Sequence, residues 1–293
     1  MAPLTFNLIA LNDSTTPEAL LSSIAKLGSS ERPVYVGKCQ HWIHAPHLSA
    51  DGLSGTGPTM LRWDYLVVIK ASSQDTLALP NALKSLTERV WSITTNHDDS
   101  QLENYAEGKA TRQNAAVPPL PNGWSPNDHS GLDAAVPPPD LEASLGLIAY
   151  PLGSRKDEGQ KPTVLKDFVR DFGTQYNSPV DMFNLLSFVP GQQPRYYQYI
   201  AAFTESVGSK YGGDAIFLGT SVGNWSSKAD EQSGVEGDAV GWEHSALIHY
   251  PSIWHFGKML DDPGYADADR RFKQGALRDN PIMCCTEVEV SYE

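Results

Sequence analysis

The sequence FNLLSF, Phe183 to Phe188, decides the fold that we predict for this chain. Its apolar residues are bounded by prolines on both sides, which indicates a short buried strand. One polar residue, Asn184, interrupts the run. Near the N-terminus the string FNLIAL, Phe6 to Leu11, carries Asn7 at the matching place. The repetition predicts that the chain contains two copies of one structural unit.

Further matches between the two copies follow in the same order along the chain. Val36-Gly37 matches Leu218-Gly219, and Trp63-Asp64 matches Trp242-Glu243. Each copy reads as strand, helix, strand, strand, helix, strand, which is the order of the ferredoxin-like split βαβ arrangement. We therefore predict an α+β fold in which two ferredoxin-like β-α-β-β-α-β units pack sheet to sheet as an intramolecular α+β barrel.

The predicted organisation has three parts. Unit 1 spans 1–152 and includes a Pro-rich irregular insertion at about 96–140, a connecting helix lies within 153–180, and unit 2 spans 181–293. In unit 1 we expect a second helix that begins near Pro80, with an apolar stripe of Leu83, Leu86, Val90 and Ile93. Residues 145–152 return to strand composition.

Composition narrows the possible partners and the compartment. The formal net charge of −13 argues against binding to nucleic acid or to an anionic membrane, since both need clustered Lys and Arg. No apolar stretch approaches the roughly 20 residues that a membrane helix requires, and the N-terminal residues do not resemble a signal peptide. Three cysteines, two of them adjacent, make no disulfide framework. We expect a cytoplasmic protein.

The second unit carries a family resemblance. The strings FNLLSFVPG, YYQYIAAFTESVGSKYGGDAIFLG, ALIHYPS and DDPGYADADRRFKQGALRDN, with the pair Trp242-Glu243, resemble the DUF1330 family of the dimeric α+β barrel superfamily. The resemblance covers about residues 182–285, and the first unit lacks the last of these blocks. Members of this superfamily pair two such sheets into a barrel. The resemblance therefore implies that a chain with two copies closes the barrel within itself.

Strand alternation predicts which side chains line the cavity between the two sheets. On each strand, alternate residues share a face, and we assigned the more polar set to the cavity. The polar side chains expected there are Asn7, Tyr35, His41, Asp64, Lys70, Asn184, Glu243, Ser245 and His249, and Phe188 is among the apolar ones. A mostly apolar cavity with a few polar groups is typical of a small-molecule site.

His41 and His249 are the predicted general bases, because imidazole titrates near neutral pH and Asp64 or Glu243 can orient it. The alternative for either histidine is a hydrogen-bonded interior residue. Both carboxylates have an alternative role as solvated groups or as partners of arginine. The predicted substrate-binding residues are Asn7, Asn184, Tyr35, Lys70, Ser245 and Phe188. For the two asparagines the alternative is a structural hydrogen bond between the sheets.

No metal or cofactor site is expected. His41, His44 and His47 are spaced by three residues, which on a strand puts neighbours of the set on opposite faces, so a metal site would require the strand to end before His44. The chain contains no GxSxG, GxGxxG or GxxxxGK[ST] pattern, so serine hydrolase, Rossmann and P-loop classes lose their main support.

Three functional hypotheses remain open. The first is a cofactor-independent enzyme of secondary metabolism, of the isomerase, cyclase or lyase type. It would act by proton transfer on a hydrophobic oxygenated small molecule, such as a polyketide or an aromatic compound. The second is a cofactor-free monooxygenase of phenolic substrates, and the third is a non-catalytic ligand-binding or stress-associated module. The wider superfamily that the resemblance indicates includes cofactor-free monooxygenases, lactone isomerases, polyketide cyclases and some heme enzymes, and a shared fold does not select among them. Assembly through outer surfaces is also open.

Overall fold

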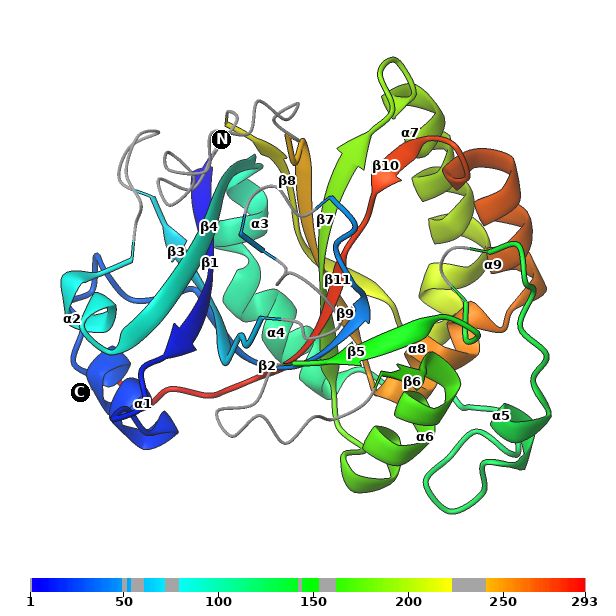
Figure 1. Ribbon diagram of the computed structural model, residues 1–293, viewed down its shortest axis with the longest axis horizontal. Coiled ribbons are helices and arrows are strands. Elements are labelled where there is room, and N and C mark those ends of the chain that lie inside the picture. The colour runs from blue at the N-terminus through cyan, green and yellow to red at the C-terminus, as the bar shows by residue number, and fades with distance from the viewer. Residues whose placement is uncertain are drawn as a thin grey trace.

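The computed structural model describes residues 2–48, 52–53, 61–71, 79–141, 144–152, 162–222 and 241–292. In this part of the chain, eight antiparallel strands form a closed barrel in the order β7-β9-β8-β4-β1-β3-β2-β11, and β11 returns to β7 (Figure 1). The strands of the barrel are β1 (Ala2–Leu11), β2 (Tyr35–His44), β3 (Tyr65–Lys70), β4 (Thr87–His97), β7 (Val180–Phe188), β8 (Asp214–Ser221), β9 (His244–Tyr250) and β11 (Ile282–Glu287).

Short strands and helices surround the barrel. The short strands are β5 (Ile148–Pro151), β6 (Thr163–Val164) and β10 (Leu277–Asp279). The α-helices are α1 (Pro17–Ala25), α2 (Asn81–Lys84), α3 (Asp99–Glu103), α4 (Tyr105–Asn114), α5 (Ser130–Ala134), α6 (Leu165–Gln175), α7 (Gln193–Phe203), α8 (Ile253–Leu260) and α9 (Pro263–Ala268). Two π-helical turns and one 3₁₀ turn continue these helices: η1 (Thr204–Gly208), η4 (Asp269–Lys273) and η2 (Ser209–Tyr211).

The two halves of the chain meet at two seams. At one seam β4 pairs with β8, where Thr95 lies opposite Ser221. At the other seam β2 pairs with β11 over a longer stretch, from Gly37 opposite Glu287 to His44 opposite Ile282. Because both seams join segments of the same chain, the prediction of a barrel closed within one chain is confirmed.

The barrel interior is packed with apolar side chains to which every strand of the ring contributes. At its centre the rings of Phe6 and Phe183, from β1 and β7, stack with their centroids 5.3 Å apart. The side chains of Leu66, Phe217 and Leu247 fill the surrounding space. An interior packed in this way contributes hydrophobic stabilisation from both halves of the chain.

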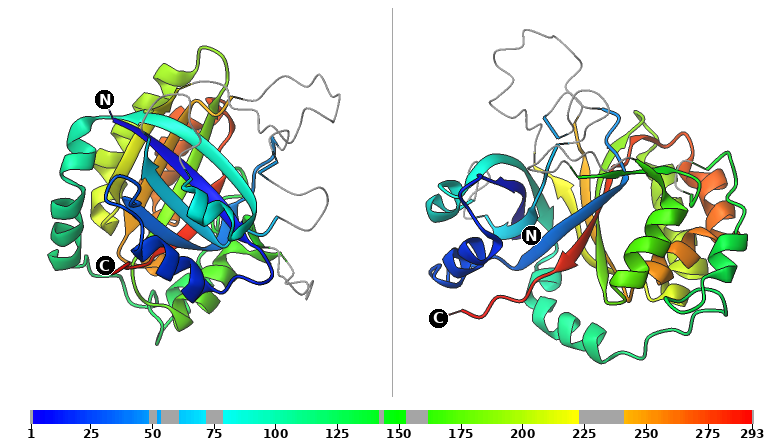
Figure 2. Two further views of the ribbon diagram at one scale, coloured as in Figure 1. Left: turned by 90° about the vertical axis from the view of Figure 1, so that its left-hand side faces the viewer. Right: turned by 60° about the horizontal axis from the view of Figure 1, so that its bottom comes forward.

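Helices cover the outer faces of the barrel on two opposite sides (Figures 1 and 2). On one side α1 and α2 pack on β1 and β3, with Leu20 and Ile24 of α1 against Ile9 and Val67. On the other side α6, α7, α8 and α9 cover β7 and β9 in a larger apolar cluster that includes Trp254 of α8. In the part of the chain that the structure describes, the helices are too short or too polar for a membrane crossing.

The predicted helix that begins near Pro80 is wrong beyond its first turn. The α2 helix ends at Lys84, and Leu86, Val90 and Ile93 do not form a helical stripe, because Thr87–His97 is strand β4. This segment is rich in β-branched and aromatic residues, which favour a strand. It pairs along its length with β1, and this tertiary pairing overrides the helical spacing of the apolar residues Leu86, Val90 and Ile93.

The insertion predicted at about 96–140 is also more ordered than expected. It contains α3, α4 and α5. Helix α4 is held against the end of the barrel, since the hydroxyl of Tyr105 and the ammonium of Lys109 both donate to Glu287 Oε1, at 2.8 and 2.9 Å. Residues 145–152 contain β5, which lies outside the ring and pairs with β2 and β6.

The predicted inward faces of β1 and β7 are wrong by one residue. Asn7 and Asn184 point away from the interior, whereas Phe6 and Phe183 point into it. Both faces of these strands are buried, one in the barrel and one under helices. Their sequences are therefore apolar on both faces, and the alternation carries no information on which face is inward.

Candidate active site

A cavity of about 380 Å³ lies between the outer face of strands β7, β8 and β9 and the helices α7, α8 and α9. The strands contribute residues such as Met182, Leu186 and Ile248, and the helices contribute side chains such as Ile200 and Phe256. Most of the wall is apolar, and the volume lies within the range of small-molecule sites. The cavity is separate from the packed interior of the barrel.

Four polar side chains gather in this cavity from distant parts of the chain. They are His44 at the end of β2, Asn184 in β7, Lys273 at the end of η4, and Asn280 between β10 and β11. Asn280 Nδ2 donates to the carbonyl oxygen of Leu185 at 3.0 Å and lies 3.4 Å from Asn184 Oδ1. We call these four residues the polar pole of the cavity.

His44 is held as a neutral imidazole. Its Nδ1 lies 2.8 Å from the carbonyl oxygen of Asn280, which can only accept, so Nδ1 carries the proton and Nε2 carries the lone pair. Burial, and to a smaller degree the nearby charges of His47 and Lys273, lower the pKa of His44 to about 4. At neutral pH the Nε2 atom therefore keeps its lone pair, and it lies 3.3 Å from Nε2 of the exposed His47, which can donate a hydrogen bond to it.

Lys273 brings a cationic side chain into the same cavity. It is only 9% exposed, and its Nζ lies 4.0 Å from Oδ1 of Asp269, which is 1% exposed. Nζ also lies 5.7 Å from the centre of the Tyr199 ring. Both charged residues belong to η4, a π-helical turn of the kind that is frequent at functional sites.

Three tyrosines of the helical layer face the cavity beside this pair. Burial raises the pKa of Tyr196, Tyr199 and Tyr265, and the carboxylate of Asp269 raises the pKa of each of them further. All three phenols therefore stay protonated at neutral pH and can donate hydrogen bonds.

The rim of the cavity contains a second histidine, His244. Its Nε2 accepts a hydrogen bond from Gln193 Nε2 at 2.6 Å, and the exposed side chains of Tyr197 and Leu218 lie at the same rim. Burial lowers the pKa of His244. His244 therefore lines the entrance of the cavity, away from the polar pole.

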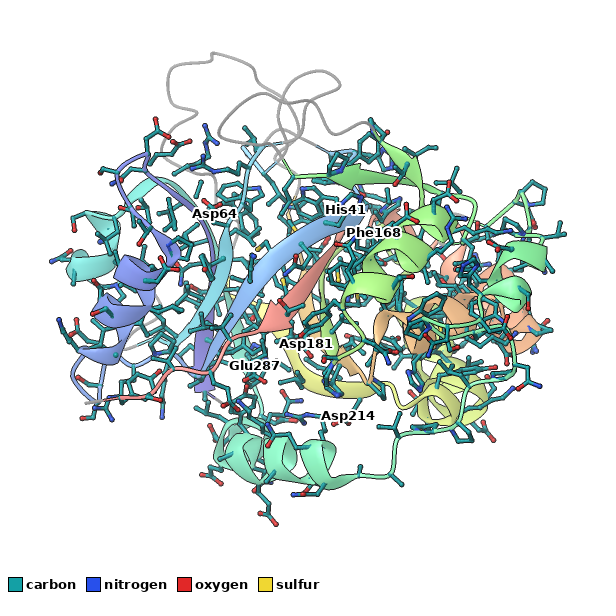
Figure 3. All side chains as sticks on the ribbon, turned by 90° about the horizontal axis from the view of Figure 1, so that it is seen from below. His41, Asp64, Phe168, Asp181, Asp214 and Glu287 are labelled. Carbon is teal, nitrogen blue, oxygen red and sulfur yellow. The ribbon has the colours of Figure 1, made fainter. Side chains whose placement is uncertain are left out.

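Two predicted site residues meet at one end of the barrel, outside the cavity. The hydroxyl of Tyr35 donates to Asp181 Oδ2 at 2.8 Å, and His249 Nδ1 donates to Asp181 Oδ1 at 3.0 Å. The carboxylate that orients His249 is thus Asp181, and neither Asp64 nor Glu243 does so. Figure 3 shows Asp181 near Glu287, well apart from Asp64.

His41 lies on the outer surface of the barrel and not in its interior. Cys284 lies opposite His41 and Cys285 opposite Cys39, so β2 carries one extra residue there and the bulge turns the His41 side chain outward. The imidazole stacks on Phe168 of α6 with the ring centroids 4.2 Å apart (Figure 3). Burial lowers the pKa of His41 to about 4. Among the described residues, its Nε2 has no hydrogen-bond partner.

Several other predicted residues hold the framework together. Asp64 accepts from the backbone N–H of Leu11 at 2.7 Å and from Arg62 Nε at 3.1 Å, which is the arginine pairing considered as its alternative. Glu243 Oε2 accepts from the backbone N–H of Phe188 at 3.1 Å. Lys70 is exposed at the end of β3.

Asn7 is likewise bonded within the framework. Its side chain donates to the carbonyl oxygen of Val67 at 3.1 Å and accepts from the hydroxyl of Ser92 at 2.7 Å. These bonds join neighbouring strands of one half of the barrel, so they do not link the two sheets as we had considered.

The remaining predicted residues lie at or beside the cavity. Asn184 belongs to the polar pole. Ser245 is among the lining residues, and its hydroxyl lies 2.9 Å from Thr95 Oγ1. Phe188 packs edge-on against Tyr196 and His244, with centroid distances of 5.3 and 5.2 Å.

The sequence interpretation missed most of the polar residues of the cavity. Tyr196 and Tyr199 share one face of a helix through their spacing of three, which is a detectable signal. His44 and Lys273 gave no comparable signal, because their proximity depends on the closure of the barrel. In the described ranges, no group of three or more His, Cys, Asp or Glu side chains is placed to hold a metal ion.

Comparisons with known proteins gave limited matches. No protein-family model matches the chain, and no curated protein matches it. A protein of unknown function from Rhodopseudomonas palustris is 21% identical over 39% of this chain and 85% of its own, with a TM-score of 0.31. A candidate monooxygenase from Lactobacillus acidophilus is 8% identical over 100% of this chain and 98% of its own, with a TM-score of 0.44. A candidate monooxygenase from Fusobacterium nucleatum is 7% identical over 100% and 94%, with a TM-score of 0.45.

Proposed function

We propose that this chain is a cofactor-independent enzyme that binds a hydrophobic oxygenated small molecule in the cavity and moves a proton on it. The observation that carries the proposal is the neutral His44 at the polar pole of an otherwise apolar cavity, whose unprotonated Nε2 exchanges its 3.3 Å contact with the exposed His47 for the substrate. The proposed reaction is an isomerisation, cyclisation or elimination, and the substrate class is a polyketide-like or aromatic compound of secondary metabolism.

The proposed mechanism begins with a substrate carbonyl directed toward the polar pole. His44 Nε2 takes a proton from the carbon next to that carbonyl, and the electron pair moves onto the carbonyl oxygen. The ammonium of Lys273 and the phenol hydroxyl groups of the helical layer stabilise the negative charge that develops there. His44 then returns the proton at a different atom, which completes an isomerisation. The apolar wall keeps water away from the enolate.

His44 takes the role that we expected of His41 or His249, because neither of those residues lines the cavity. The polar substrate contacts expected of Asn7 and Tyr35 pass in the same way to Lys273 and the tyrosines. Asn184 keeps its place as a proposed substrate contact, since it belongs to the polar pole.

We also infer that the barrel consists of two ferredoxin-like units and that residues 182–285 belong to the DUF1330 family. The strand order β4-β1-β3-β2 in the first half and β11-β7-β9-β8 in the second supports the inference, because both are the fourth, first, third and second strand of a unit. Asn7 and Asn184 support it as well, since each donates to the carbonyl oxygen two residues before it.

The proposed setting is the reduced interior of a cell, with a small hydrophobic molecule as the partner. Three free cysteines, Cys39, Cys284 and Cys285, support a reducing compartment. The net charge of −13 supports the absence of nucleic acid and of anionic membranes among the partners.

The function is tested with a panel of enolisable aryl and long-chain ketones in D₂O. Deuterium at the carbon next to the carbonyl is followed by NMR, and oxygen uptake is followed in parallel. Protein-dependent deuterium incorporation without oxygen uptake is the expected result. Oxygen uptake with a phenolic member of the panel would assign the monooxygenase alternative instead. Binding without exchange or oxygen uptake would assign a non-catalytic binding module.

A further inference from the structure

Lys273 occupies a place that is unusual for a lysine. Lysine side chains are almost never fully buried unless they are paired, and this one is 9% exposed in the wall of a mostly apolar cavity. An apolar environment disfavours the ammonium and favours the free amine, which is the nucleophilic form. The cavity thus places a potential nucleophile next to the space that the substrate occupies.

Asp269 supplies a proton acceptor for that amine. Its Oδ1 lies 4.0 Å from Lys273 Nζ, one turn earlier in the same helical segment, and the carboxylate is 1% exposed. A buried pair of opposite charges can exchange one proton to become a neutral amine and a neutral acid, which removes the desolvation cost of both charges. When the two side chains close from 4.0 Å to hydrogen-bond distance, the proton can pass to Asp269 and release the amine as a nucleophile.

We propose that Lys273 forms an imine with a ketone or β-dicarbonyl substrate inside the cavity. This inference rests on the proposed function, because it assigns the substrate carbonyl to the same cavity. It adds a covalent step and a substrate class. The carbonyl carbon bonds to Lys273 Nζ, and the mechanism no longer needs the cavity to stabilise a free enolate.

The atoms of this step balance within the protein and the substrate. The ammonium of Lys273 gives one proton to Asp269, and the amine then adds to the carbonyl carbon while a second nitrogen proton moves to the oxygen. Asp269 returns its proton to the resulting hydroxyl group, and that oxygen leaves as water. The products are one iminium ion, which keeps the positive charge, and one water molecule.

The other residues of the cavity fit the following step. The positive iminium nitrogen draws electrons from the neighbouring carbon, so His44 Nε2 removes a proton there more easily than from the free ketone. The protonated phenols of Tyr196, Tyr199 and Tyr265 line the same cavity, Lys273 Nζ lies 5.7 Å from the Tyr199 ring, and Tyr199 and Tyr265 are hydrogen-bonded to each other, so this layer offers a donor for the departing oxygen. Lys273 is thus the proposed nucleophile and His44 the proposed base.

The experiment uses 2,4-nonanedione, a hydrophobic β-diketone, as the probe. Its imine rearranges to an enaminone, which is stable without a reductant and absorbs in the near ultraviolet. The intact chain is incubated with the probe, and the modified lysine is located by peptide mass spectrometry. We expect a single adduct per chain on Lys273, at least ~10-fold above the labelling of the exposed Lys210, because only a lysine in an apolar cavity is activated.

Variants and a second measurement keep the outcomes separate. Lys273→Arg keeps the charge and should remove the adduct. His44→Gln should keep the adduct and lose deuterium exchange. Peptide mapping of the unaltered chain decides the matter even if a variant does not fold. Labelling that is absent from Lys273, or equal on Lys210, would overturn the imine proposal. If deuterium exchange persists in that case, the proposed function stands without the covalent step.

Discussion

His44 Nδ1 lies 2.8 Å from the backbone carbonyl oxygen of Asn280, and this hydrogen bond joins the first half of the barrel to the second. The bond sits at the seam where β2 pairs with β11. It fixes the proton on Nδ1 and leaves the lone pair on Nε2, which lies 3.3 Å from Nε2 of the exposed His47. The closure of the barrel therefore creates the base, since neither half of the chain holds His44 in this state alone.

The rate of proton transfer should depend little on pH from about pH 5 to pH 8. The neutral form of His44 is the active form, and its pKa is lowered to about 4, so the base is already deprotonated across that range. Below about pH 5 the rate should fall as His44 takes up a proton. The pH profile of kcat/KM checks this. A rise in rate centred near pH 6.5, the usual value of a histidine, would contradict the account.

Filling the cavity should abolish binding without harming the fold. Ala246 of β9 faces the cavity between the strands and α7, so Ala246→Phe places a ring in the empty space. We expect ligand affinity to fall at least ~10-fold, while the melting temperature stays level or rises as the void is filled. Ala201→Phe on the exposed face of α7 is the matched control and should change neither quantity. Unchanged ligand affinity in the Ala246→Phe variant would show that the ligand binds outside this cavity.

Removing the hydroxyl of Tyr35 should destabilise the closed barrel. This hydroxyl donates to the buried carboxylate of Asp181 and so links β2 to β7 across β11. Tyr35→Phe leaves one carboxylate oxygen without this donor, and we expect the free energy of unfolding to fall by about 1.5 to 3 kcal/mol. Urea denaturation measures the loss. Tyr197→Phe at the exposed rim serves as the control, and an equal effect in both variants would contradict the role of the bond.

The fold should lose stability as the pH falls from about 6.5 to about 4. His41 and His97 are buried, and burial lowers the pKa of each to about 4, whereas the unfolded chain binds protons near pH 6.5. Between these values the unfolded chain binds more protons, so acid favours unfolding, by up to about 3 kcal/mol for each histidine. His41→Phe keeps the stack on Phe168 and removes one titrating group. It should weaken the pH dependence of stability. Equal slopes in the unaltered chain and in His41→Phe would refute this prediction.

The framework of the barrel could be predicted from the sequence because local patterns determine it. The strings around Asn7 and Asn184 correctly placed β1 and β7, and their repetition predicted closure within one chain. Strand β4 was missed, because its pairing with β1 is a tertiary contact that overrides the spacing of Leu83, Leu86 and Val90. Local propensity carries no information about such a partner.

The candidate site could be predicted only in outline. The sequence predicted a mostly apolar cavity with a few polar groups between the two sheets. The structure has such a cavity, but it lies between one sheet and the helices that cover it. The inward faces of β1 and β7 could not be read, since both faces are buried. The bulge in β2 that turns His41 outward leaves no mark in the sequence. His44 and Lys273 come together only through the β2–β11 seam and the η4 turn, which are properties of the folded chain.

The most direct test of the account is the rate of deuterium incorporation into the panel ketone that exchanges fastest, compared between the unaltered chain and His44→Gln. The glutamine keeps a polar side chain of similar size but cannot take up the proton. The account predicts a fall of at least about 100-fold in the exchange rate, with an unchanged melting temperature and unchanged ligand affinity. His129→Gln should exchange at the original rate. A His44→Gln variant that remains folded and exchanges as fast as the unaltered chain would contradict the central claim.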